Sequence, residues 1–161
     1  VHMPKIIKDL NVVEDSWQVW RDTENLPSTG GYIVPFALWQ THKDALQALG
    51  EIAVFLASDQ SPKLLGADVS RFALIAVDFP KFADGRGFSY GRELREQHGF
   101  TGELRAIGDF MRDQLFFLKR CGFNSFALES DELDEALASF NDFSDAYQPS
   151  IDQALPAFRR R

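Results

Sequence analysis

The sequence predicts an α/β fold whose parallel sheet is built from βαβ units. The segment Phe72–Val77 is apolar at every position, as in a central parallel strand that helices cover on both faces. After it, helix-length patterns alternate with the short strand patterns Gly102–Ile107 and Ser125–Leu128, which predicts right-handed crossovers. The chain has 161 residues, whereas a complete eight-fold barrel needs roughly 200 or more. Two arrangements therefore stay open, an open sheet and a partial TIM-like barrel.

The residues before this alternation predict further short strands. Ile6–Trp20 alternates loosely between apolar and polar residues, with a polar break at Glu14–Asp15, and this pattern predicts a short N-terminal β-hairpin. Tyr32–Leu38, interrupted by Pro35, and the compact apolar run Ile52–Leu56 are also of strand length.

Several polar residues are of the kind that begins a helix. Thr41, followed three residues later by Asp44, resembles a capping box and predicts a short helix. Ser89, Asp109 and Asp131 each precede a helical pattern of apolar residues, and we expect them to be N-caps.

Length and composition predict one globular domain. The chain is 45% hydrophobic and 25% charged, which is typical of a folded single domain. We expect that domain to span residues 4–148. Val1–Met3 has the look of a cloning remnant, and residues 149–161 form a polar tail that ends in three arginines.

Charge and residue usage exclude several classes of function. The formal net charge of −7 argues against nucleic-acid binding, and no apolar run approaches the ~20 residues that span a bilayer. Cys121 is the single cysteine, which fits a reducing compartment, so we expect a cytoplasmic protein. It closes a predicted helix, where the dipole raises the pKa of a thiol. His42 and His98 are too few for a zinc site, and no motif predicts a cofactor or an oligomeric state.

A mixed, arginine-rich region predicts where a polar site lies. Eight basic and seven acidic side chains fall between Asp78 and Arg120, although the whole chain is acidic. Ligands of parallel α/β sheets bind beyond the carboxyl ends of the strands, which here are the loop Asp78–Gly87 and the turn Gly108–Arg112. The candidate ligand-binding residues are Asp78, Lys81, Asp84, Arg86, Arg105, Asp109 and Arg112.

Arg105 stands out because it falls inside a strand that the pattern buries on both faces. A buried arginine needs a carboxylate or a bound anion. We therefore expect either a structural ion pair with Asp78, Asp109 or Glu103, or an arginine that binds a ligand.

Gly85 and Gly87 permit close backbone approach to an anion, and Lys81 and Arg86 add positive charge. Gly85, Gly87 and Gly91 resemble the glycine pattern of a dinucleotide-binding fingerprint, but their spacing does not match it. A tight turn held by the loop's own charges is the structural alternative.

Longer motifs in the same region carry a resemblance to a known family. They are Phe79-Pro80-Lys81-Phe82-Ala83-Asp84-Gly85-Arg86-Gly87, Leu94-Arg95, Phe100-Thr101-Gly102-Glu103-Leu104-Arg105-Ala106, Gly108-Asp109, Arg112-Asp113-Gln114-Leu115-Phe116 and Arg120-Cys121-Gly122-Phe123. The chain resembles the bacterial domain-of-unknown-function family 934 from about Gly31 to Gln148. Members of that family are labelled oxidoreductases of sulfite reduction because their genes neighbour those of assimilatory sulfite reductase. The resemblance supplies no catalytic residues.

Three functions follow as expectations. The first is a participant in sulfite reduction that binds a small anion at the arginine-rich rim. The second is a non-catalytic accessory protein that docks on sulfite reductase, which the fifteen phenylalanines would serve. The third is a nucleotide-binding enzyme that uses the Gly85/Gly87 loop.

Overall fold

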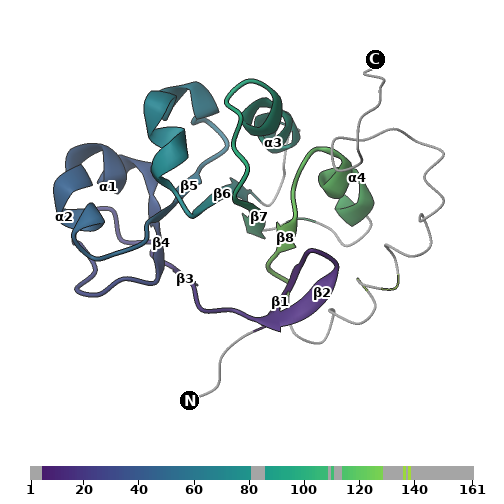
Figure 1. The fold of residues 1–161 in the computed structure, drawn as a ribbon, viewed down its shortest axis with the longest axis horizontal. Coiled ribbons are helices and arrows are strands. Elements are labelled where there is room, and N and C mark those ends of the chain that lie inside the picture. Colours follow the sequence, from purple (N-terminus) through teal and green to yellow (C-terminus); the bar gives the residue numbers. More distant parts are fainter. Residues whose placement is uncertain are drawn as a thin grey trace.

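The computed structural model describes residues 5–80, 86–108, 110, 114–128, 136 and 138. Its eight strands form one sheet in the order β2-β1-β8-β7-β6-β5-β4-β3 (Figure 1). Their bounds are β1 Lys5–Lys8, β2 Asn11–Glu14, β3 Gln18–Val19, β4 Tyr32–Pro35, β5 Ala53–Leu56, β6 Leu74–Phe79, β7 Glu103–Gly108 and β8 Ser125–Phe126.

The sheet is mixed, which corrects the expectation of a purely parallel one. Strands β3 to β8 pair in parallel, each with its neighbour in that order. A short N-terminal hairpin is present as β1 and β2, but its turn lies at Asp9–Leu10 and not at the polar break Glu14–Asp15. Strand β1 pairs antiparallel with β8, so the hairpin extends the sheet. Antiparallel addition is possible here because the hairpin precedes the βαβ units and needs no crossover to reach the sheet edge.

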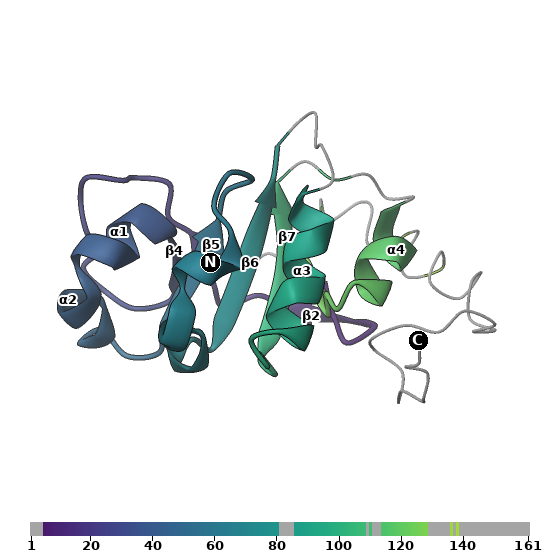
Figure 2. The same cartoon turned by 90° about the horizontal axis from the view of Figure 1, so that it is seen from above.

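The helices connect the parallel strands and cover one side of the sheet (Figure 2). Their bounds are α1 Phe36–Thr41, α2 Lys43–Gln47, the 3₁₀ helices η1 Pro62–Leu64 and η2 Gly66–Arg71, α3 Arg86–Glu96 and α4 Leu115–Arg120. None of the helices among the described residues is long and apolar enough to cross a membrane.

The sheet is curled into an open half-barrel, and the chain itself shows why. β2 and β3 lie at opposite ends of the strand order, yet Glu14 and Gln18 are separated by four Cα steps, which span at most about 15 Å. A flat sheet of eight strands is roughly 34 Å wide. The segment Asp15–Trp17 therefore forces the two edges toward each other, and it runs along the open side of the curve (Figure 1).

Each face of the sheet has its own apolar core. The convex face carries Ile75, Val77 and Phe79 against the helices. The concave face carries Leu74, Ala76 and other residues under Trp17 and Val19. Strand β6 is thus buried on both faces, as its apolar run predicts.

Two of the predicted helix caps are wrong. Thr41 ends α1 instead of preceding α2, and its hydroxyl donates back to the carbonyl of Ala37 at 3.3 Å, a local bond that competes with capping. Ser89 lies inside α3, which already includes Arg86. The predicted caps Asp109 and Asp131 lie outside the described residues, as do Val1–Met3 and residues 149–161.

Candidate functional site

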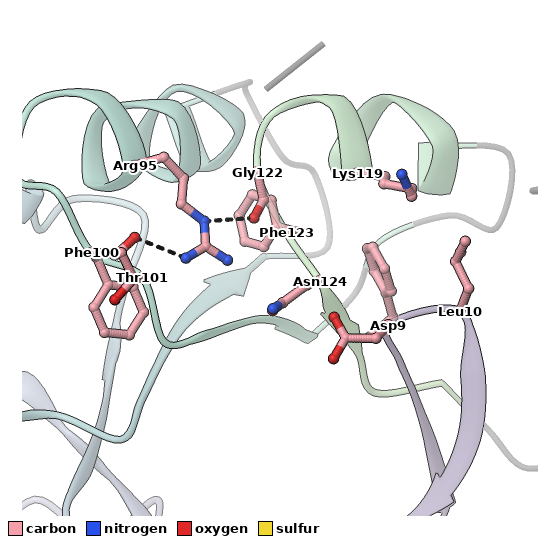
Figure 3. A pocket seen from close by; sticks show the side chains of 10 residues that line it. Asp9, Leu10, Arg95, Phe100, Thr101, Lys119, Gly122, Phe123 and Asn124 are labelled. Carbon is pink, nitrogen blue, oxygen red and sulfur yellow. Dashed lines mark hydrogen bonds between the residues drawn. The ribbon is translucent and has the colours of Figure 1, made fainter. Parts of the chain in front are cut away.

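A cavity of about 600 Å³ opens at the amino ends of β7 and β8. The last turn of α3, the end of α4 and the turn between β1 and β2 surround it (Figure 3). This basal cavity, as we name it, lies at the opposite ends of the strands from the predicted rim. Its polar lining consists of Asp9, Arg95, Thr101, Lys119 and Asn124, and its other lining residues are Leu10, Phe100, Gly122, Phe123 and Phe126.

Arg95 is held rigidly at the cavity wall. Its Nε donates to the carbonyl of Gly122 at 2.9 Å, and its Nη1 donates to the carbonyls of Phe100 and Gly102, both at 2.9 Å. The guanidinium also lies over the ring of Phe100, 5.6 Å from its centroid. Within the described part of the chain, Nη2 has no hydrogen-bond partner, and in Figure 3 it points into the cavity.

Gly122 makes this position of Arg95 possible. Its φ of +110° and the free space above its Cα let the arginine stem pass. A Cβ there would come within 2.6 Å of Arg95 Cγ.

The positive charge of this wall is poorly solvated. Burial lowers the pKa of the Arg95 guanidinium, and the nearby carboxylate of Asp9 opposes that shift. Burial also lowers the pKa of Lys119. Arginine stays protonated under such conditions, and a partly desolvated cation attracts anions more strongly than a hydrated one does.

Asp9 faces Arg95 from the β1–β2 turn. Its backbone N–H donates to the carbonyl of Asn124 at 2.9 Å, and Asn11 Nδ2 donates to its carbonyl at 3.0 Å. Among the described residues its carboxylate makes no hydrogen bond and no ion pair. Asn124 Oδ1 accepts from the N–H of Leu104 at 2.8 Å, which leaves the Asn124 amide N–H groups for the cavity.

The β1–β2 turn adopts an uncommon backbone conformation. Asp9 and Leu10 have φ values of 51° and 66°, as both central residues of a type I′ turn must, although the second position favours glycine. Leu10 is 44% exposed at the cavity rim.

Of the predicted rim residues, Asp78, Arg86 and Arg105 are described, and each has interactions of its own. Asp78 accepts from Arg21, with Oδ2 2.6 Å from Nη1 and Oδ1 3.3 Å from Nη2, and Arg21 also lies over the ring of Phe55. Arg86 is exposed at the start of α3 and is not free of interactions. The others, Lys81, Asp84, Asp109 and Arg112, lie outside the described residues, so the rim stays a prediction.

Arg105 is the centre of a buried charge network on the concave face. Its Nη2 lies 2.7 Å from Glu103 Oε2, its Nη1 lies 3.0 Å from both oxygens of Asp15, and its Nε donates to Ser125 Oγ at 3.0 Å. Ser125 in turn donates to Glu103 at 2.7 Å, and Lys8 Nζ lies 3.3 Å from the same carboxylate. The ion pair with Glu103 confirms the structural expectation. Asp78 pairs with Arg21 instead.

Asp15 was missed by the sequence because it lies 90 positions from Arg105. The polar break at Glu14–Asp15 was the signal, but it indicated a turn and no partner. Burial alone would raise the pKa of Glu103, but the hydrogen bond from Ser125 and the charges of Arg105 and Lys8 outweigh burial and lower that pKa.

The glycines of the supposed nucleotide loop have a packing role where they are described. A Cβ on Gly87 would come within 2.5 Å of the Phe79 ring, and one on Gly91 within 2.4 Å of the Phe123 ring. Both positions therefore let α3 pack closely on the sheet. Gly85 lies outside the described residues, and nucleotide binding stays a prediction.

The aromatic composition mainly serves the core. Eight of the described phenylalanines are buried, and Phe117, at 49% exposure, is the exposed one among the described residues. Docking on sulfite reductase stays a prediction. Cys121 is also buried, and burial is the main cause that raises the pKa of its thiol.

Sequence patterns did not identify the basal cavity. The family motifs include Arg95, Gly102 and Gly122. A basic residue near a helix C-terminus stabilises the helix, however, so the sequence offered no reason to assign Arg95 to a binding site. The convergence of α3, α4 and the hairpin turn is a tertiary property.

A family model described as a bacterial protein of unknown function, DUF934, matches residues 53–158. No curated protein and no solved structure matches the chain.

Proposed function

The chain belongs to the bacterial DUF934 family, and we propose that it binds a small organic anion in the basal cavity, in the service of sulfite reduction. The single observation that supports anion binding is the hydrogen bonding of Arg95. Its guanidinium donates to three backbone carbonyls and to no carboxylate among the described residues.

The chemistry of the wall supports an anion. Carbonyl oxygens orient a guanidinium but do not neutralise it, so its charge remains available to a ligand. Lys119 adds a second cation, and Asn124 and Thr101 add polar groups on the same cavity. A fixed, partly desolvated arginine that offers free N–H groups is suited to carboxylate, sulfonate or phosphate oxygens.

The size and apolar lining of the cavity indicate that the bound anion has an apolar organic part. A cavity of about 600 Å³ lies within the range of roughly 300–1,000 Å³ for small-molecule sites and is far larger than an inorganic oxyanion needs. Leu10, Phe100 and Phe123 supply apolar surface beside the charged groups.

Calorimetric titration tests the site directly. The probes are benzoate and 3-phenylpropionate beside sulfite, sulfate and phosphate. We expect an organic anion to bind the wild-type chain and to bind Arg95→Gln about tenfold to a hundredfold more weakly, because a charged hydrogen bond contributes about 1.5–3 kcal/mol.

Arg92→Gln is the matched control, because Arg92 lies on the same helix but pairs with Glu96 at 3.4 Å and does not line the cavity. Unchanged affinity in that variant and loss in Arg95→Gln support the site. Absence of binding for every probe, or equal binding in both variants, would contradict it.

The place in sulfite reduction rests on the family resemblance and needs a separate test. We expect a strain without the gene to grow on cysteine and to grow poorly on sulfate and on sulfite. Equal growth on all three sulfur sources would contradict the role in sulfite reduction. It would not bear on the proposed anion-binding site.

A further inference from the structure

We infer that the ligand of the basal cavity is a zwitterion, an α-amino acid with a bulky apolar side chain. The inference rests on the proposed anion site and adds a second pole to it. It comes from two opposite charges, Asp9 and Arg95, that share one cavity and do not pair with each other.

Neither charge has a complete set of protein partners, Arg95 on a half-buried wall and Asp9 on an exposed turn. Arg95 keeps Nη2 without a partner in the described part of the chain, and the same holds for the carboxylate of Asp9. They are close enough for Asp9 to influence the guanidinium, yet no ion pair joins them. Figure 3 shows both groups turned toward the same space from opposite walls, with Asn124 between them.

The backbone holds the Arg95 guanidinium in place and fixes the turn that carries Asp9. The Arg95 guanidinium is held by the carbonyls of Gly122, Phe100 and Gly102. Asp9 is held by its N–H bond to Asn124 and by Asn11 on its carbonyl. Such preorganisation reduces the entropy that binding must overcome.

The strain in the β1–β2 turn fits the same purpose. A leucine at φ 66° costs the fold stability that a glycine would not. This turn places the Asp9 carboxylate beside the cavity and the Leu10 side chain at the cavity rim.

An α-amino acid matches these features. Its ammonium and carboxylate sit on one carbon, so a single small group would reach both Asp9 and Arg95. The second carboxylate oxygen would meet the amide N–H groups of Asn124. The side chain would then lie against Leu10 and the phenylalanine walls, where apolar burial contributes about 25 cal/mol per Å².

The test compares amino acids with their desamino analogues by calorimetry on the full chain. The pairs are L-phenylalanine with 3-phenylpropionate and L-leucine with 4-methylpentanoate, which differ in the ammonium group alone. We expect at least one amino acid to bind the wild-type chain about tenfold more tightly than its analogue, because a charge-assisted hydrogen bond to the ammonium is gained.

Asp9→Asn should abolish or reverse that preference while the analogue binds as before. Asp59→Asn, which removes the same charge from an exposed loop residue after β5, should leave the preference unchanged. An unfolding curve for each variant shows that both remain folded.

The outcomes separate this inference from the proposed function. If the analogues bind as tightly as the amino acids, or if Asp9→Asn keeps the preference, the zwitterion is overturned and the anion site stands. If amino acids and analogues all fail to bind, as well as the inorganic and aromatic anions, both proposals fail.

Discussion

Two arginines of this protein have opposite surroundings, and the fold buries Arg105 fully and Arg95 in part. Arg105 on the concave face contacts two carboxylates and a serine hydroxyl, and its side chain is 3% exposed. Arg95 at the basal cavity contacts three backbone carbonyls and no carboxylate among the described residues. One charge is neutralised by the protein, and the other is positioned but left available.

This difference separates structure from binding. A buried charge whose hydrogen bonds and countercharges are complete contributes specificity to the fold and has nothing to offer a ligand. A charge with incomplete compensation on a cavity wall is a candidate for recognition. Burial alone, which the sequence pattern predicted for Arg105, does not distinguish the two.

The largest effect should come from Arg105→Met. The variant leaves Asp15 buried without its cation and Glu103 with only the half-exposed Lys8. We expect a loss of about 3–5 kcal/mol in the free energy of unfolding, measured with urea. Arg92→Met, which breaks an exposed pair on α3, should cost less than about 1 kcal/mol.

Adding Asp15→Asn and Glu103→Gln to Arg105→Met should recover part of that loss, because no uncompensated charge then remains. Losses of the same size for Arg105→Met and Arg92→Met would show that the network is not the structural centre of the concave face.

Ser125→Ala should have the next largest effect. The hydroxyl is fully buried and bonds both Arg105 and Glu103, so its removal should cost about 1–3 kcal/mol in urea unfolding. Ser70→Ala is the matched control, because that exposed hydroxyl bonds a local carbonyl and should change stability by less than about 0.5 kcal/mol.

Gly122→Ala tests the other arginine. A methyl group there adds backbone strain at φ +110° and a clash with Arg95 Cγ, and we expect a loss of about 1–3 kcal/mol together with weaker anion binding. Gly99→Ala has a φ of +66° but nothing within 4 Å of its new Cβ. It should therefore lose stability and keep binding, and weakened binding in both variants would refute the steric role of Gly122.

The pH dependence of the Arg105 network has a definite sign. The pKa of Glu103 is lowered in the fold below its ordinary value of 4.5, so its contribution is complete above that pH and is lost as pH falls through the folded-state pKa. The difference in unfolding free energy between wild type and Glu103→Gln should therefore shrink as the pH is lowered from 6 to 3. A difference that stays constant over this range would contradict the assigned interactions.

The smallest effect, with the opposite sign, should come from Leu10→Gly. Glycine accepts the positive φ of this turn position without strain. The free energy of unfolding, measured by thermal unfolding, should therefore rise by about 1 kcal/mol. Binding of an apolar ligand should weaken, because the rim loses its leucine. A loss of stability would mean that the leucine side chain outweighs the strain of its backbone.

The alternation of strand and helix patterns correctly predicted the parallel strands β6, β7 and β8, and the apolar run of β6 correctly predicted a strand covered on both faces. It could not predict that β1 pairs with β8, since hairpin residues carry no signal for the sheet edge they join. The capping prediction at Thr41 failed because its hydroxyl bonds the helix that it ends. The prediction at Ser89 failed because that residue lies inside α3.

The sequence by itself determined the α/β class, the burial of Arg105 and the family, because these depend on local patterns and on long specific motifs. The tertiary structure decided that the sheet is mixed and curled, that Asp15 neutralises Arg105, and that Arg95 and Asp9 share a cavity. Those facts depend on which distant segments contact each other. The three-residue link between β2 and β3 helps to set these contacts in space, but it has no recognisable pattern in the sequence.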